Sequence, residues 1–369
     1  MIVLPKRENS LRLDMKSSMS KSLEFFLSGI KTKATRTTYM ASISDFRAYF
    51  NKRDFDSLLE IKPDDVRKMV EQIVIRDKNR GLSKSHINGK ICAIKLFYVM
   101  NDIEIQTLRA KKMLPSAKKL TGGKPYSTEL LQQVLKALNT KFSLPLKCVV
   151  LIMASCGSRV GFTEYLKIKH IGEFEKNSCK SILIYGGEKE EYYSFINPET
   201  VKVVDEWIEY RKSKGEIITK DSWVIPKAQD HTKPSDQKAI QPRIVKKLEH
   251  IDRGEKVGGR SEIAITHGIR KRWKTIAENT DGVNSSKVEK MFGHSTSNVL
   301  DNTYYKPDFA NLFKEYEKFS DELVVSQEAR LESELLRKDK IIEENQAQKD
   351  DKIKELEERI ARFEKFIKI

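Results

Sequence analysis

Helical periodicity dominates the first third of the chain. Apolar side chains recur three or four residues apart, first at Tyr39, Ile43, Phe46 and Phe50. An α-helix turns every 3.6 residues, so these positions fall on one face. Pro63 and the two aspartates after it are typical of a helix start, because proline suits the first turn and acidic groups favour the positive end of the helix dipole. A further helix is expected from Ser83. The pattern predicts a helical domain over residues 18–108, preceded by an N-terminal tail at 1–17.

A second pattern, which mixes helices with short strands, begins near residue 125. Ser127 is a typical N-cap for a helix with an apolar stripe. The segment LPLKCVVLIMASCG that follows is almost wholly apolar, which predicts a buried helix ending at Gly157. The runs SILIYG and YYSFI, joined by the residues GEKEE, indicate a β-hairpin.

Helical spacing continues through the rest of this region, with one gap. Asn197, followed by a proline, predicts a helix start. Residues 214–262 show no clear period, and helical spacing returns at 267–277 and 286–292. Together these elements predict a fold that is mainly α with a small β-sheet (α+β) over residues 125–320.

The last segment, 321–369, is helical in composition and contains neither glycine nor proline. Apolar residues alternate by three and four at its end, at Ile353, Leu356, Ile360, Phe363 and Ile367. Further back, across a polar break, another register holds Leu331, Leu335 and Ile342. We predict a C-terminal helix that forms a short coiled coil. The alternative is a single amphipathic helix that folds back onto its own domain.

Positive charge is concentrated at the N-terminal end. The chain carries 69 Lys and Arg against 53 Asp and Glu, a formal net charge of +16. Residues 1–124 hold 26 of the basic residues and 13 of the acidic ones, which leaves +13 there. A polyanion is the natural partner of such a segment, because each phosphate neutralised by Lys or Arg releases a counterion. A solvated surface rich in lysine is the alternative.

The basic charge includes a segment at 109–124, RAKKMLPSAKKLTGGK, that has six Lys or Arg and no acidic residue. Pro115 and the Gly-Gly pair interrupt regular structure there. We therefore predict an interdomain linker that follows a nucleic-acid backbone. The helix that starts near Ser83 also carries basic positions outside its apolar stripe. The predicted DNA-binding residues are Lys84, Lys90, Lys111, Lys112, Lys118 and Lys119.

Other features of the sequence narrow the class of protein. No apolar run approaches about 18 residues, and the N-terminus MIVLPKRENS lacks the apolar core of a signal peptide, so we expect a cytoplasmic protein with no membrane partner. The sequence has no GxxxxGK[ST] loop, and its four cysteines show neither a CxxC pair nor zinc spacing. We expect no metal, no nucleotide cofactor and no disulfide framework.

Four separated motifs carry the candidate chemistry. In chain order they are SCGSRVGFTEYL, GEKEE, THGIRKRW and GHSTSNVLDNTYYKP. In this order and spacing they resemble the tyrosine site-specific recombinases, the phage-integrase family, and the YYKP ending is similar to integrases of archaeal viruses and plasmids. The resemblance implies a helical core-binding, DNA-clamping domain at 18–108 and a tyrosine-recombinase catalytic domain at 125–320.

Carried over by position, the resemblance implies a catalytic set of Arg159, Lys189, His267, Arg270, His294 and Tyr304. Tyr304 would be the nucleophile, and its neighbour Tyr305 is the alternative. Lys180 competes with Lys189 for the role of acid. Phe162 stands where the family usually has an acidic residue that orients the first arginine, so Glu164 is expected to serve there.

The implied reaction needs no cofactor. Arginine forks match the phosphoryl oxygens of a scissile phosphate, and a tyrosine attacks it to give a 3′-phosphotyrosyl intermediate. The resemblance also implies a homo-oligomer, four protomers on two DNA duplexes, that integrates or excises a mobile element. Residues 308–325 would then pack against a neighbouring protomer. The alternatives are relaxation of DNA by a type IB topoisomerase and a non-catalytic DNA-binding or architectural protein.

Overall fold

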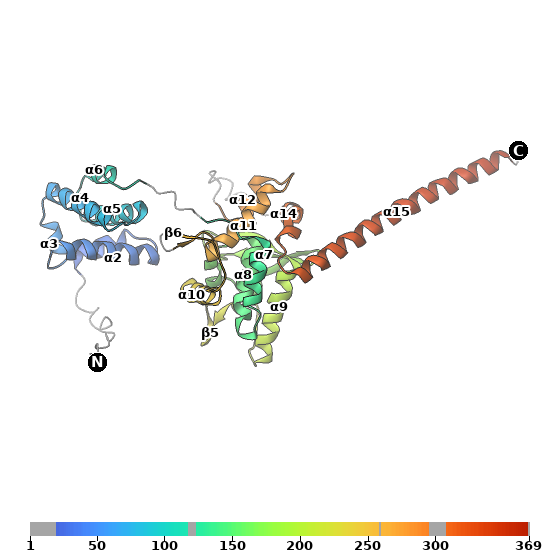
Figure 1. Ribbon diagram of the computed structural model, residues 1–369, viewed down its shortest axis with the longest axis horizontal. Helices are drawn as coiled ribbons and strands as arrows, with labels where there is room; N and C mark the ends of the chain where they lie inside the picture. Colours follow the sequence, from blue (N-terminus) through green and yellow to red (C-terminus); the bar gives the residue numbers. More distant parts are fainter. Residues whose placement is uncertain (1–19, 117–122, 258–259, 295–307, 368–369) are drawn as a thin grey trace. The chain divides into compact units, whose positions relative to one another are not determined.

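The computed structural model describes residues 20–116, 123–257, 260–294 and 308–367 (Figure 1). The chain forms two compact units, an N-terminal unit at Met1–Leu120 and a C-terminal unit at Thr121–Ile369. Their boundary falls inside the basic segment 109–124. Each unit has its own apolar core.

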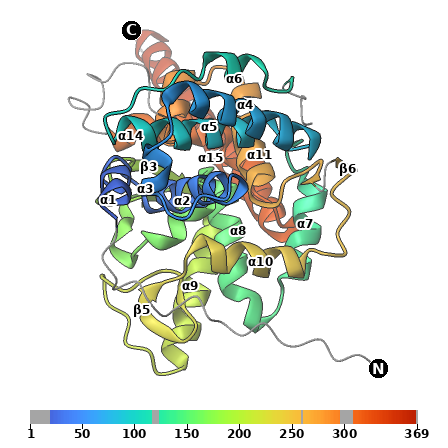
Figure 2. The same ribbon diagram turned by 90° about the vertical axis from the view of Figure 1, so that its left-hand side faces the viewer.

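The N-terminal unit is built from helices. They are α1 (Lys21–Ser28), α2 (Lys33–Tyr49), α3 (Asp56–Leu59), α4 (Pro63–Asn79), α5 (Lys84–Val99) and α6 (Leu108–Lys112). Pro63 opens α4 as predicted, and the Ser83 side chain accepts a hydrogen bond from the backbone N–H of His86 at the start of α5. Helices α2 and α5 pack side by side (Figure 2). On the predicted apolar face of α2, Ile43 and Phe46 are fully buried in one core with α5, and Tyr39 and Phe50 are partly buried against it.

Lys90 corrects one of the predicted DNA-binding residues. Its side chain is buried, and its ammonium lies 2.5 Å from the Asp77 carboxylate and 2.8 Å from that of Asp45. Lys90 lies on the buried face of α5 together with Ile87 and Ile94. A buried ammonium group needs an acidic partner, because it has lost its contact with water. Lys90 therefore neutralises buried acid in the core, and no free charge is left for a phosphate.

The C-terminal unit begins with two helices that lead to a three-stranded sheet. The elements are α7 (Thr128–Ala137), η1 (Lys141–Ser143), α8 (Leu144–Cys156), η2 (Val160–Glu164), η3 (Ile168–His170), β1 (Ile171–Lys176), β2 (Cys179–Ile184) and β3 (Tyr192–Ile196). The strands are antiparallel in the order β1-β2-β3, and Ile182 of β2 faces Ser194 of β3. The predicted hairpin is the β2–β3 pair. Strand β1 was not predicted.

The remaining elements of this unit are mainly helical. They are α9 (Pro198–Ser213), β4 (Pro226–Lys227), β5 (Asp230–Pro234), α10 (Gln237–Lys247), β6 (Lys256–Val257), β7 (Arg260–Ser261), α11 (Ile265–Asn279), α12 (Ser285–Met291), α14 (Phe309–Leu323) and α15 (Gln327–Ile367). The predicted mainly α fold with a small β-sheet is confirmed.

Helix α8 forms the centre of the unit. Nearly all of its side chains are buried, and it packs against α9 and α11. Among the described residues no single helix is long and apolar enough to cross a membrane. Thr128–Ala137 with Lys141–Cys156 passes that test as a pair, by length and composition only, and this pair is bent by 116°.

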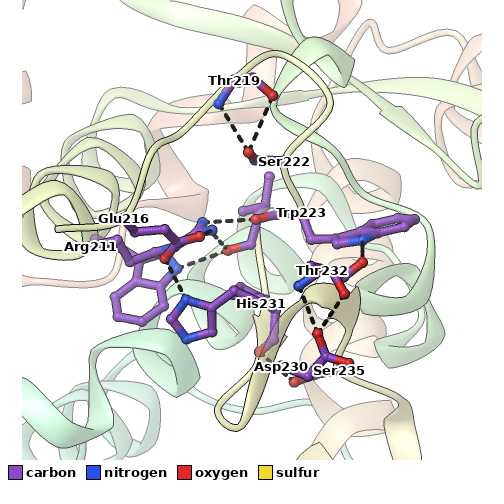
Figure 3. Close-up of polar contacts among 12 residues, drawn as sticks. Arg211, Glu216, Thr219, Ser222, Trp223, Asp230, His231, Thr232 and Ser235 are labelled. Atoms are coloured by element: carbon purple, nitrogen blue, oxygen red, sulfur yellow. Dashed lines mark hydrogen bonds and ion pairs between the residues drawn. The ribbon is translucent and has the colours of Figure 1, made fainter. Parts of the chain in front are cut away.

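Polar contacts organise the stretch without a hydrophobic period, 214–262. Arg211, at the end of α9, is buried and forms a two-pronged ion pair with Glu216 (Figure 3). Its guanidinium also donates to the carbonyl of Trp223 at 2.8 Å, and His231 Nδ1 lies 2.8 Å from the Glu216 carboxylate. A charged side chain in the core thus fixes this segment, which explains why no apolar repeat marks it.

Helix α14 packs on its own chain. Phe313, Tyr316 and Phe319 are fully buried, and the Tyr316 hydroxyl lies 2.9 Å from the Ser155 hydroxyl of α8. The expectation that residues 308–325 pack against a neighbouring protomer remains a prediction, which now concerns the exposed face of α14. The apolar stripe of α14 is buried in the core of its own unit.

Helix α15 starts at a fixed point. The backbone N–H groups of Val325 and Ser326 each donate to the Glu199 carboxylate at 2.8 Å. Beyond its first turns, apolar side chains of α15 stay open to solvent, with Leu335 61% and Leu356 55% exposed. A helix that folded back onto its own domain would cover these side chains, so the structure does not support that alternative.

The buried ion pairs of Lys90 lead to a prediction. We expect Lys90→Ala to lower the free energy of unfolding by about 3 kcal/mol, because it leaves the Asp77 carboxylate short of a partner in the core. Lys84→Ala is the matched control on the exposed face of α5 and should change it by less than about 0.5 kcal/mol. Urea unfolding of the full chain measures both, and equal effects would contradict the assignment.

Candidate active site

The end of α8 sets the position of Arg159. The chain leaves the helix at Gly157 with φ of 68°, a left-handed conformation that favours glycine. A Cβ at this position would lie 2.8 Å from the ring of Trp273 on α11, so there is also no room for a side chain. Ser158 and Val160 are buried, whereas Arg159 between them is exposed. Among the described residues the Arg159 side chain has no hydrogen-bond or ion-pair partner.

Arg270 joins the end of α8 to the end of α12. It lies on α11, is 5% exposed, and its guanidinium donates to the carbonyl of Gly157 and, at 2.7 Å, to the carbonyl of Phe292. The same guanidinium lies 3.5 Å from the centre of the Phe292 ring. Gly157 precedes Arg159 by two residues, and Phe292 precedes His294 by two. One buried cation therefore places both segments that carry candidate site residues.

The two arginines and His267 share one electrostatic environment. Burial, and after it the charges of Arg270 and Arg159, lower the pKa of His267 below its usual value. Burial also lowers the pKa of Arg270, and Arg159 adds to that effect. Burial raises the pKa of Tyr185, while Arg159 and Arg270 oppose the rise. The cationic groups are thus near enough to destabilise one another, and a bound anion would offset that repulsion.

His294 follows α12 and is held by a carboxylate. Its Nδ1 lies 2.5 Å from the Glu289 carboxylate, which also pairs with Lys274. Burial opposes ionisation of Glu289, but the hydrogen bonds from Lys274 and His294 outweigh it and hold its pKa below the usual range. The preceding Gly293 has φ of 66°, and a Cβ there would overlap the ring of Tyr192 at 2.2 Å. With Nδ1 occupied, the other ring nitrogen of the half-exposed His294 is left for a ligand.

The remaining predicted catalytic residues are less constrained. Lys189 lies in the turn between β2 and β3, is exposed, and has no hydrogen bond or ion pair within the described part of the chain. Lys180 lies at the opposite end of β2 from that turn. Tyr304 and Tyr305 lie outside the described residues. The structure therefore brings Arg159, His267, Arg270 and His294 together, and leaves the choice between the two lysines open.

Glu164 corrects the expectation about the orientation of Arg159. Its carboxylate accepts a hydrogen bond from the backbone N–H of Gln237 at 3.1 Å, which places it at the first turn of α10. Its described contacts do not include Arg159. The acid thus serves the start of a helix that the sequence did not predict.

The basic run after His267 is structural. Lys271 donates to the carbonyl of Gly123 at 2.6 Å. Arg272 is buried, donates to the carbonyls that end α14, and burial lowers its pKa to about 10. Lys274 pairs with Glu289 and Glu278. Of the run's two arginines, Arg272 contacts the end of α14, whereas Arg270 contacts Gly157 and Phe292 beside the candidate site.

Three residues of the site were missed by the sequence analysis. Glu289 orients His294, Tyr192 fills the space beside Gly293, and Trp273 covers Gly157. Trp273 lies three residues after Arg270 on the same helix, and that spacing is the one signal that points to it. Glu289 and Tyr192 act through contacts that no local pattern marks.

The other predicted DNA-binding lysines lie on the surface where they are described. Lys84 is exposed at the first turn of α5, and Lys111 and Lys112 are exposed on α6. Lys118 and Lys119 lie outside the described residues. Within the described ranges no group of three or more His, Cys, Asp or Glu side chains is placed to hold a metal ion.

A comparison with protein families identifies the class. The mainly helical fold with small antiparallel sheets is that of a tyrosine recombinase. The model of the phage integrase family matches residues 127–311, which is half of the 369-residue chain. The chain belongs to the phage integrase family, and the predicted resemblance is confirmed.

Solved structures share the fold at low identity. The Tn1549 transposon integrase in complex with transposon right end DNA is 18% identical with a TM-score of 0.52, over 81% of this chain and 99% of that one. A lambda integrase dimer bound to a COC′ core site is 10% identical with a TM-score of 0.53, over 74% and 89%. The XerH recombinase bound to its difH substrate is 18% identical with a TM-score of 0.50, over 70% and 74%. No curated protein sequence matches the chain.

Crowding at Gly293 gives a test of the site's construction. We expect Gly293→Ala to lower the free energy of unfolding by about 3 kcal/mol, since it adds a collision with the Tyr192 ring to the left-handed strain. Gly282→Ala is the matched control, because Gly282 also has positive φ of 72° but open space around it; about 1 kcal/mol is expected there. Urea unfolding compares the two, and similar losses would show that Tyr192 does not constrain this turn.

The cations around His267 give a prediction about pH. Because its folded pKa lies below the unfolded value of 6.5, the unfolded chain takes up the proton more readily, and the stability that His267 contributes declines as the pH falls below 6.5. An NMR titration of the His267 ring should give a midpoint under 6.5. Arg159→Ala should move that midpoint upwards, because one repelling charge is removed. An unchanged midpoint would mean that Arg159 does not face His267.

Proposed function

We propose that this chain is a site-specific DNA recombinase that cleaves and rejoins DNA strands through a 3′-phosphotyrosyl intermediate. The observation that carries the proposal is the buried guanidinium of Arg270, which ties Gly157 to Phe292. Through these two contacts Arg159 and His294, 135 positions apart in sequence (294 − 159), belong to one site. A site with exposed cationic and imidazole groups, in which no acidic residue of the described ranges pairs with Arg159, suits a phosphodiester.

In the proposed mechanism Arg159 and Arg270 neutralise the non-bridging oxygens of the scissile phosphate. Two carbonyls already accept hydrogen bonds from the Arg270 guanidinium, so in the proposed mechanism Arg270 contributes mainly its fixed positive charge. Arg159 supplies the guanidinium that hydrogen-bonds the phosphate oxygens. His267 and His294 hydrogen-bond the phosphate or move protons. The lowered pKa of His267 favours its neutral form near pH 7, in which it can accept a proton.

Tyr304 is proposed as the nucleophile, with Tyr305 as the alternative. Its hydroxyl gives its proton to neutral His267 and its oxygen forms a bond to phosphorus, while the bond to the 5′ oxygen breaks and that oxygen takes a proton from Lys189 to leave as a 5′-hydroxyl. In the second step a 5′-hydroxyl of the partner duplex gives its proton to Lys189 and attacks the phosphotyrosine, and the tyrosine oxygen leaves with the proton held by His267. One phosphate ester replaces another at each step, so the chemistry consumes no nucleotide.

Double-stranded DNA is the proposed partner. Exposed Lys84, Lys111 and Lys112, with Lys118 and Lys119 of the basic segment, supply positive charge near a backbone. In this proposal residues 18–108 clamp the duplex and residues 125–320 perform catalysis. The similar structures of Tn1549 integrase, XerH and lambda integrase were obtained in complex with DNA, which supports the proposal. We further propose that the protein assembles as a tetramer on DNA. The tetramer would integrate or excise a mobile element of archaeal virus or plasmid type.

Covalent capture on nicked suicide substrates, taken from a library of candidate attachment DNA, tests the chemistry. The wild-type chain should become attached to DNA, and peptide mapping should place the adduct on Tyr304. Tyr304→Phe should abolish the adduct and Tyr305→Phe should leave it; the reverse pair of results would move the nucleophile to Tyr305.

Arg159→Ala separates catalysis from binding in the same assay. We expect at least a 100-fold loss of adduct, because the free fork on the phosphate is gone, with DNA affinity changed less than about threefold. Lys84→Ala should show the opposite, weaker binding with normal cleavage at saturating protein. An adduct that survives both tyrosine variants would refute the phosphotyrosyl mechanism, and strand exchange between two sites would distinguish recombination from relaxation.

A further inference from the structure

Helix α15 carries an apolar stripe with no partner in its own unit. Leu331, Ile342 and Ile353 are each more than half exposed and are spaced by eleven residues. Eleven residues make close to three turns of an α-helix, so the three side chains follow one face across the polar break. Leu335, Leu356 and Ile360 add to that face at three- and four-residue steps and are exposed as well. Such a long stripe on a solvated helix calls for a second helix.

The start of α15 is fixed to the unit that carries it. The Glu199 carboxylate holds the N–H groups of Val325 and Ser326, and Arg330 donates to the carbonyl of Val324 at 3.2 Å. From Gln327 to Ile367 the helix is continuous and contains neither glycine nor proline. A helix fixed at one end without a hinge does not fold back to cover its own stripe. Within the described part of the C-terminal unit no element covers the stripe, which leaves it available to a helix of another molecule.

Charges beside the stripe select the partner and its direction. With Ile353 and Ile360 at heptad position a, and Leu356 at d, Lys352 holds a g position and Glu357 holds the e position of the next heptad. In a parallel pair each g residue faces the e residue of the next heptad on the other helix, so the two symmetry-related contacts between Lys352 and Glu357 join opposite charges. In an antiparallel pair g faces g and e faces e, and like charges would meet.

We propose that two copies of this chain associate through α15 as a parallel, in-register, two-stranded coiled coil, independently of DNA. The sequence complements itself in this one direction, which argues for a second copy of the chain as the occupant. The polar residues between Ile342 and Ile353 interrupt the apolar seam, and polar residues at such positions favour a single register. The pairing would join the catalytic units of two protomers before any DNA is bound.

Cysteine cross-linking of the full chain tests direction and register. Leu356→Cys in a Cys92→Ser background should form a disulfide-linked dimer under mild oxidation, because d positions of a parallel pair face each other. The other three native cysteines are buried. Lys354→Cys, at an outward b position two residues away, is the matched control and should stay monomeric on a non-reducing gel. Absence of the Leu356→Cys dimer, or equal cross-linking of both variants, would overturn the proposal.

A charge exchange tests the partner's identity by a second route. Sedimentation equilibrium should show that Lys352→Glu or Glu357→Lys alone weakens dimerisation roughly tenfold, because each turns two attractions into repulsions. The double variant with both changes should recover the wild-type dissociation constant, since the g–e pairs are restored with their signs exchanged. A wild-type chain that sediments as a monomer, or a double variant no tighter than the single ones, would refute the parallel pair. Circular dichroism checks that each variant keeps its helix.

Discussion

A single buried guanidinium holds this active site together. Arg270 lies in the core, where an unpaired cation is costly, and it escapes that cost by donating to the carbonyls of Gly157 and Phe292 and by stacking on the Phe292 ring. Those carbonyls end two helices that are remote in sequence. Satisfying the cation therefore also fixes where Arg159 and His294 leave their helices.

The surroundings of Arg270 leave the site short of negative charge. Arg159 is exposed without a described partner, and together with Arg270 it lowers the pKa of His267. The Glu289 carboxylate at this end pairs with His294 and Lys274. Repulsion among the cations is tolerated in the free protein because Arg159 is solvated, and the proposed phosphate would relieve it.

Elsewhere in the protein, acidic side chains pair with buried cations or backbone N–H groups and so fix the position of other elements. Asp77 forms an ion pair with the buried Lys90, and Glu216 forms one with the buried Arg211. Glu199 fixes the turn before α15 by accepting hydrogen bonds from two backbone N–H groups. The last of these connects the catalytic unit to the helix proposed to pair. The turn at Val325 and Ser326 thus joins the active-site framework to the proposed dimer contact without a flexible tether.

Local information in the sequence determined most of the elements. The N-cap at Ser127, the proline at Pro63, the apolar helix ending at Gly157 and the β2–β3 hairpin depend on side chains near in sequence, and the HxxR and GH motifs marked His267, Arg270 and His294. Tertiary structure alone decided that Lys90 is buried, that Glu164 serves α10, that α14 packs within its own unit and that Glu289 orients His294. Each of these depends on which group from a distant part of the sequence lies beside the charge or ring in the folded core. A pattern along the sequence does not contain that information.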